Sequence, residues 1–145
     1  MLYEKVLRNL KNKKKMDIKL KYSKIIPFPG FYACTIFNCI FRHPKYKNRN
    51  ISKITYNHEM IHVEQQLDFV GGNEKFYILG GIIFYIWYFI EWLIKLLISG
   101  FTLGKVKAYR SISFEQEAFT NDQTLKYRTY RKRFHWLKYV FKVIK

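Results

Sequence analysis

The central part of the chain reads Asn57-His58-Glu59-Met60-Ile61-His62-Val63-Glu64-Gln65-Gln66. Residues four positions apart lie on the same face of an α-helix, so His58 and His62 can direct their imidazoles at one metal ion. Glu59 follows the first histidine, where its carboxylate can reach a water on the metal instead of the metal itself. This pattern is typical of metal-assisted hydrolysis, in which Zn²⁺ lowers the pKa of water and a glutamate takes its proton. We therefore expect a helix over about 52–69 that binds Zn²⁺ through its two histidines, with Glu59 as general base.

A zinc ion in a catalytic site needs a third protein ligand and leaves its fourth position to water. The other two histidines, His43 and His135, do not extend the motif at a spacing that would supply this ligand. The chain has only 10 Asp and Glu against 27 Lys and Arg, yet three of the seven acidic residues after His62 gather in the segment 113–122. They are Glu115, Glu117 and Asp122. We expect a carboxylate from a second helix, over about 110–127, to complete the site.

Together, these two segments resemble the pattern of the gluzincin metallopeptidases, in which HExxH is followed by a helix carrying E-x-x-A-D or E-x-E-A-D. The chain is also similar to a group of small, uncharacterised Bacteroidetes-type zincin-like proteins. Three stretches carry this second resemblance: Asn57 to Gln66, Phe84-Tyr85-Ile86-Trp87-Tyr88-Phe89-Ile90-Glu91-Trp92-Leu93, and Arg110-Ser111-Ile112-Ser113-Phe114-Glu115-Gln116-Glu117-Ala118. The resemblance covers most of residues 51–130 and implies a minimal zincin-like fold.

The resemblance leaves two candidates for the third ligand. In the E-x-E-A-D form the first glutamate binds zinc, which corresponds to Glu115, but the position of the aspartate is occupied by Phe119. A phenyl ring cannot accept a conventional hydrogen bond from a ligating imidazole. Shifting the register by two residues makes Glu117 the ligand and Asn121 the group that accepts this hydrogen bond. The two glutamates are about 200° apart on a helix, so only one can face the metal; the longer match favours Glu115.

The segment before the motif has the pattern of β-strands. Ile18, Leu20 and Tyr22 alternate with lysines, and the aromatic and β-branched run 31–41 follows a turn at 27–30. We expect a small antiparallel sheet ahead of the helices, which makes the chain an α+β protein with a single zincin-like domain over 1–145 and a basic segment at 1–15. An edge strand within 31–41 would align an extended peptide or protein substrate by β-augmentation.

A long apolar stretch, 76–103, separates the two segments of the site. Residues 76–90 carry no charge. The only charged residues in 76–103 are Glu91 and Lys95, which are four positions apart. A helix that is apolar on all sides is a core element or is associated with a membrane. Three interpretations stay open: a helix at the membrane interface, a buried helix and a full span.

The C-terminal segment 128–145 is rich in lysine and arginine, with apolar residues at helical spacing, which predicts a basic amphipathic helix. The net charge of the whole chain is +17. This charge favours an acidic partner, and an anionic membrane surface fits better than nucleic acid because no nucleic-acid-binding motif is present. Cys34 and Cys39 are five residues apart on an expected strand and would point to opposite faces, so we expect reduced thiols, which suit a cytoplasmic protein. Together with the preference for an anionic membrane surface, this predicts a cytoplasmic protein that is peripheral at the inner face of the membrane.

The sequence therefore predicts a zinc metallopeptidase that hydrolyses peptide bonds through a zinc-activated water. The alternative is a non-catalytic membrane-surface or interaction protein with a structural or vestigial zinc site.

Overall fold

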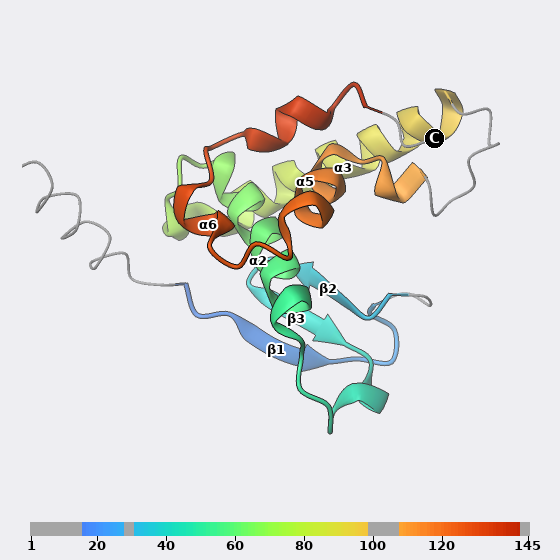
Figure 1. Cartoon of the computed structure of the whole chain (residues 1–145), viewed down its shortest axis with the longest axis vertical. Helices are drawn as coiled ribbons and strands as arrows, with labels where there is room; N and C mark the ends of the chain where they lie inside the picture. The colour runs from blue at the N-terminus through green and yellow to red at the C-terminus, as the bar shows by residue number, and fades with distance from the viewer. Residues whose placement is uncertain (1–15, 28–30, 99–107, 143–145) are drawn as a thin grey trace, which may run out of the picture.

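The computed structural model describes residues 16–27, 31–98 and 108–142. Its described part is of the α+β class, as expected: three short strands are followed by helices (Figure 1). The strands are β1 (Lys19–Tyr22), β2 (Ala33–Ile36) and β3 (Cys39–Arg42), in the order β1-β3-β2. The basic segment 1–15 lies outside the described residues.

The sheet is mixed, whereas we expected an antiparallel sheet. β2 and β3 are antiparallel and are joined by a tight turn in which Phe37 has a φ of 53°. β1 instead pairs in parallel with β3, with Lys19 opposite Cys39. The alternating pattern of a strand predicts which residues share a face but not the direction in which the strand pairs. Both cysteines are free thiols.

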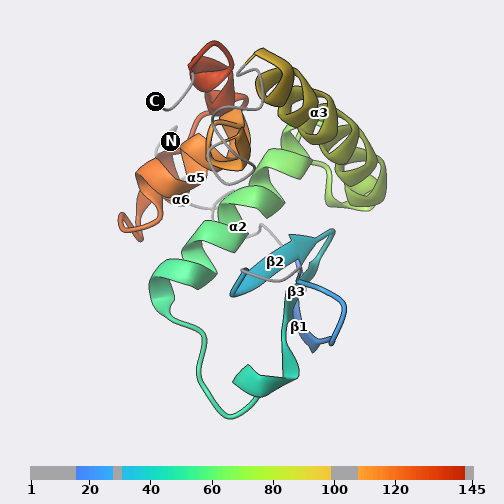
Figure 2. The same ribbon diagram turned by 90° about the vertical axis from the view of Figure 1, so that its right-hand side faces the viewer.

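Helix α2 (Lys53–Asp68) confirms the helix expected over 52–69 and lies across one face of the sheet (Figure 2). It begins at Ser52, whose side chain accepts a hydrogen bond from the backbone N–H of Thr55. It ends at a glycine pair: Gly71 and Gly72 both have positive φ, and the N–H of Gly72 reaches back to the carbonyl of Leu67.

Helix α3 (Tyr77–Ile98) follows the 3₁₀ turn η2 (Glu74–Phe76) and crosses the C-terminal half of α2. The two backbones approach closely at Gly80, where a Cβ atom would lie 2.3 Å from the carbonyl oxygen of Gln66. Glycine is therefore required at this crossing. The apolar stretch expected over 76–103 is helical up to Ile98, and its last five residues lie outside the described part of the chain.

Helix α5 (Ser113–Asn121) packs against α2 and also contacts α3, where the rings of Phe84 and Phe114 are 4.4 Å apart; it is shorter than the helix expected over 110–127. The main apolar cluster lies between α3, α5 and the C-terminal segment. Its buried members are Phe84, Ile112, Phe114 and Trp136. A short 3₁₀ turn, η1 (Pro44–Tyr46), connects the sheet to α2.

The prediction of a continuous C-terminal helix over 128–145 is wrong for the described residues of this segment. Helix α6 ends at Tyr130 after a single turn (Tyr127–Tyr130), and the 3₁₀ helix η3 covers only His135–Tyr139. Between them Arg131 leaves the helical conformation, with a ψ of 129°, and Phe134 is left-handed, with a φ of 58°. The helix breaks because the side chain of Arg131 turns inward to reach buried carboxylates, a pairing that local sequence pattern cannot reveal. Residues 143–145 lie outside the described residues.

Candidate metal centre

Three buried side chains from two helices meet at one point. His58 and His62 lie one turn apart on α2, with their Nε2 atoms 3.2 Å from each other. Glu115 of α5 faces both, with Oε2 3.4 Å from Nε2 of His58 and Oε1 3.3 Å from Nε2 of His62. Each side chain offers a donor atom to the same small volume, so the group could hold a metal ion.

The donor set passes a test of fit. The exposed fractions of His58, His62 and Glu115 are 8%, 7% and 3%, so water cannot satisfy their polar atoms freely. Oε2 of Glu115 is buried and accepts no hydrogen bond from the residues that the structure describes; its contact with Nε2 of His58 is long, at 3.4 Å. A buried carboxylate oxygen without a partner is costly, and a cation at this point would satisfy it. Two imidazoles and one carboxylate are also a ligand set that suits zinc.

The geometry decides between the two glutamates that the sequence left open. Glu115 faces the histidines, and the hydroxyl of Tyr88 on α3 donates to its Oε1 at 2.9 Å. Glu117 lies on another side of α5, where Arg131 donates to both of its carboxylate oxygens. Because Arg131 and Tyr127 hold Glu117 in place, its carboxylate is committed to this ion pair.

Glu59 is buried beside this group but does not belong to it. The hydroxyl of Thr35, on strand β2, donates to Oε2 of Glu59 at 2.7 Å and also contacts the Glu59 carbonyl oxygen at 3.2 Å. The other carboxylate oxygen, Oε1, makes no hydrogen bond with the described residues. The sheet therefore fixes the direction of the carboxylate and leaves one oxygen for a proton.

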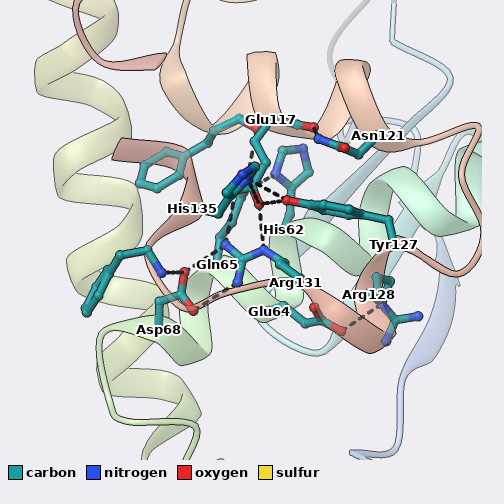
Figure 3. A network of polar contacts seen from close by, with 12 residues as sticks. His62, Glu64, Gln65, Asp68, Glu117, Asn121, Tyr127, Arg128, Arg131 and His135 are labelled. Atoms are coloured by element: carbon teal, nitrogen blue, oxygen red, sulfur yellow. Dashed lines mark hydrogen bonds and ion pairs between the residues drawn. The ribbon is translucent and has the colours of Figure 1, made fainter. Parts of the chain in front are cut away.

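Gln65 determines which nitrogen of His62 carries the hydrogen. Its Oε1 lies 2.8 Å from Nδ1 of His62, and its Nε2 donates to the carbonyl of Phe114 and to Oε2 of Glu117 (Figure 3). Because the amide nitrogen is committed to these two acceptors, the amide oxygen faces the ring and accepts from Nδ1–H. Nε2 of His62 is then left to point at Glu115 and at a metal.

The group beside Nδ1 of His58 is Asp122 and not Asn121, which we expected to accept a hydrogen bond from a ligating histidine if Glu117 were the ligand. Asn121 donates its side-chain amide to the carbonyl of Glu117, and the carboxylate of Asp122 lies 3.4 Å from Nδ1 of His58. The ring of Phe119 packs against the imidazole, with centroids 4.6 Å apart. Asp122 belongs to the acidic cluster that drew attention to this segment, but it follows Glu115 by seven residues, so the family pattern did not indicate it.

A network of buried charges extends behind Gln65. Arg131 donates to both oxygens of Asp68, at 3.0 and 2.8 Å, as well as to Glu117 (Figure 3). Despite the burial of Glu117, which raises its pKa, the hydrogen bond and charge of Arg131 hold this pKa below the ordinary value. The side chain that orients His62 is therefore held in turn by an ionised network.

The charges of the site act on one another in the metal-free protein. Burial lowers the pKa of His62, but the Glu115 carboxylate outweighs burial and raises this pKa to about 9. Burial raises the pKa of Glu115, and the two histidines more than reverse this effect and hold it well below its ordinary value. The carboxylate is therefore ionised, and a metal ion has to displace a proton from His62 at neutral pH.

A cavity of about 590 Å³ lies between strand β2 and helix α3 and reaches the site. Glu59, His62 and Glu115 form part of its wall, and all four residues of β2 line it. The rest of the wall is mostly apolar and aromatic. It comprises Ile26, Pro27, Phe31, Phe84, Tyr85, Tyr88, Phe89, Trp92 and Tyr109.

No protein-family model matches the chain, and neither a curated protein nor a solved structure is detectably similar to it. The resemblance to the gluzincins therefore stays a prediction, and the geometry of the site is the basis on which a function can be proposed.

Proposed function

We propose that the protein is a zinc-dependent hydrolase of peptide bonds. The observation that carries this proposal is the convergence of His58, His62 and Glu115 beside a cavity whose wall includes His62, Glu115 and the candidate base Glu59. Two histidines and a glutamate are the ligand set of catalytic zinc sites that keep an open position. Zn²⁺ held by these residues supplies a Lewis acid that lowers the pKa of water and polarises a carbonyl group.

The residues of the chain have separate tasks in this proposal. Gln65 and Asp122 orient the two imidazoles through their Nδ1 atoms. Thr35 holds Oε2 of Glu59, so that Oε1 takes a proton from the attacking water. The same carboxyl group returns that proton to the amine nitrogen as the C–N bond breaks.

The substrate we propose is an extended, apolar stretch of peptide. Within the described part of the chain, β2 pairs with β3 only and is therefore an edge strand. The hydroxyl of Tyr85 donates to the Thr35 carbonyl of this strand at 2.8 Å, so an extended segment that binds along the edge as an additional strand would replace this hydrogen bond. Since every residue of β2 lines the cavity, a segment added there would lie beside the metal centre with its side chains among aromatic residues.

The metal assignment is tested by inductively coupled plasma mass spectrometry on the purified protein. We expect about one zinc per chain and loss of this zinc in the double variant His58→Ala, His62→Ala. Absence of stoichiometric zinc from the wild type, or its retention in the double variant, would overturn the metal assignment.

Catalysis is tested separately with Glu59→Gln, using quenched fluorescent peptides rich in apolar residues. We expect this variant to keep its zinc and to lose hydrolysis by at least about 100-fold, the contribution of a positioned general base. Glu64→Gln is the matched control, because it makes the same change on the same helix at a residue that binds Arg128 outside the cavity. Equal activity of the two variants would show that Glu59 is not the base.

A structural metal site in a non-catalytic protein is the second candidate, favoured by the deep burial of all three ligands. In that case removal of zinc would lower the free energy of unfolding, and the zinc-loaded wild type would hydrolyse none of the peptides.

A further inference from the structure

The outward side of helix α3 is apolar along its whole length. Twelve of its 22 residues are exposed, and each of the twelve is a large hydrophobic side chain. They are Ile78, Leu79, Ile82, Ile83, Ile86, Trp87, Phe89, Ile90, Leu93, Ile94, Leu97 and Ile98. We call this set the outer face of α3. Contiguous apolar surface on this scale marks a site of contact with a partner or a membrane.

The charges of the helix point the other way. Glu91 and Lys95 are 6% and 3% exposed, and Nζ of Lys95 lies 2.8 Å from Oε1 of Glu91. Glu91 also accepts hydrogen bonds from the backbone and side chain of Ser113, and Lys95 donates to the carbonyl oxygens of Ser111 and Lys142. Helix α3 thus buries its charged side chains and exposes its apolar ones, whereas a surface helix in water exposes its charged side chains.

We propose that the outer face of α3 docks the protein on an anionic lipid bilayer, with the helix in the plane of the membrane. The proposal does not depend on catalysis at the metal centre. By length and composition α3 could cross a membrane. A span would carry α2 and α5, which contact its inner side, into the hydrocarbon together with their exposed polar residues, and this is costly. Lying in the plane buries only the apolar side.

The charge of the chain selects an anionic bilayer from the surfaces that could cover this face. The segment after Phe134 runs along α3, since the ring of Trp136 lies 5.4 Å from that of Trp87 and the carbonyl of Lys142 binds Lys95. In this segment the exposed lysines alternate with exposed apolar residues: Leu137, Lys138, Phe141 and Lys142. Basic groups beside an apolar surface favour anionic headgroups. A second copy of the chain would instead bring another net charge of +17 to the interface.

The outer face continues into the cavity of the metal centre. Phe89 is 60% exposed on α3 and also lines the cavity, and Trp92, one turn further on, does so too. Their rings are 6.0 Å apart. A protein seated on this face therefore has the part of the cavity wall formed by Phe89 at the level of the lipid surface.

Flotation with lipid vesicles tests the proposal. We expect the zinc-loaded protein to float with vesicles of phosphatidylcholine and phosphatidylglycerol. Binding should weaken when the salt concentration is raised and should be much lower on phosphatidylcholine alone. The double variant Ile86→Glu, Ile90→Glu places two charges on the outer face, and we expect its partition coefficient to fall by at least about tenfold.

The matched control is Ile54→Glu, an apolar-to-acidic change at a residue that is 47% exposed, compared with 57% and 50% for Ile86 and Ile90. It lies in the first turn of α2, at the end of that helix remote from α3 (Figure 1). We expect this variant to float like the wild type. Circular dichroism and zinc content are expected to be unchanged in both variants, because all three side chains are exposed.

Three results would overturn the proposal: failure of the wild type to float with anionic vesicles, equal flotation of the double variant and the wild type, or equal binding to zwitterionic and anionic vesicles. Light scattering after size exclusion separates a protein partner from a lipid one. If the outer face joins two copies, the wild type is a dimer that the double variant converts to a monomer, while its flotation does not change. The lipid and salt series use the wild type, so they decide the matter even if a variant folds poorly.

Discussion

Replacing Gln65 by methionine removes the group that fixes the orientation of His62. The change keeps the volume of the side chain but removes the acceptor 2.8 Å from Nδ1 of His62. It also leaves the carbonyl of Phe114 and one oxygen of Glu117 without their donor. His62 can then carry its hydrogen on Nε2, the nitrogen that has to face the metal. Partners of this kind contribute about 10- to 100-fold to metal affinity, which is about 1.4–2.7 kcal/mol.

The assay is competition for zinc with a chromophoric chelator at pH 7.5, on protein shown to be folded by circular dichroism. Urea unfolding of the metal-free protein measures the separate cost to the fold, which we expect to be about 1–3 kcal/mol, because the lost hydrogen bonds are buried.

The matched control is Gln66→Met at the next position of the same helix. Gln66 is 2% exposed, and its amide nitrogen has no hydrogen-bond partner among the described residues, so this change leaves the histidines untouched. We expect its zinc affinity to stay within about twofold of the wild type, well below the effect of losing a ligand's partner. If Gln65→Met binds zinc as tightly as Gln66→Met, Gln65 does not set the orientation of His62, and our account of the network behind it is wrong.

Two further predictions concern the charges around the site. Arg131→Met leaves two buried carboxylates without their cation and should lower the free energy of unfolding by about 3–5 kcal/mol. The control is Arg128→Met, at an ion pair whose side chains are 23% and 25% exposed, and it should lower this free energy by at most about 1 kcal/mol. Equal losses for the two variants in urea unfolding would contradict the argument that burial makes the Arg131 pairs important. The pKa of His62 is raised from 6.5 to about 9 in the metal-free protein, so its pairing stabilises the metal-free fold below pH 6.5 and this contribution is lost as the pH rises through 9. Zinc affinity should therefore increase from pH 7 to 9 with release of about one proton, measured by calorimetry in buffers of different ionisation enthalpy, and an affinity independent of pH in this range would refute the raised pKa.

Features that depend on local spacing could be predicted from the sequence. The i, i+4 spacing of His58 and His62 places both on one face of any helix that contains them, and Ser52 supplies the cap that begins this helix. The choice between Glu115 and Glu117 depends on the rotation of α5 about its axis. Residues 113–118 are all buried although four of the six are polar, so polarity does not mark an exposed face from which that rotation could be read. Only the packing of α5 against α2 determines it.

Features that depend on distant partners could not be predicted. The expected C-terminal helix has apolar residues at helical spacing, but Arg131 pairs with Asp68, which is 63 residues away, and the chain breaks there to allow this contact. Asn121, expected to accept a hydrogen bond from a ligating histidine if Glu117 were the ligand, donates to the Glu117 carbonyl instead. Asp122, which lies beside Nδ1 of His58, still has helical backbone and follows Glu115 by about two turns, so its place depends on the same rotation of α5. The parallel pairing of β1 likewise depends on the path of the chain between the strands.

The two charges in the apolar stretch link the metal centre to the outer face of α3. Phe84, Tyr88, Glu91 and Lys95 follow one another at intervals of four, three and four residues, so they share one face of the helix. On this face Tyr88 donates to Glu115, and Glu91 accepts from the first N–H of α5, where Ile112 provides no side-chain cap. A carboxylate at this helix terminus is stabilised by the helix dipole, and Lys95 balances its charge. Because Glu91 and Lys95 both lie on the inner face, where they help to position α5 and its Glu115, the outer face of α3 carries no charge. The buried charges of α3 thus serve the metal centre, and the exposed side of the helix is left suitable for lying on a membrane surface.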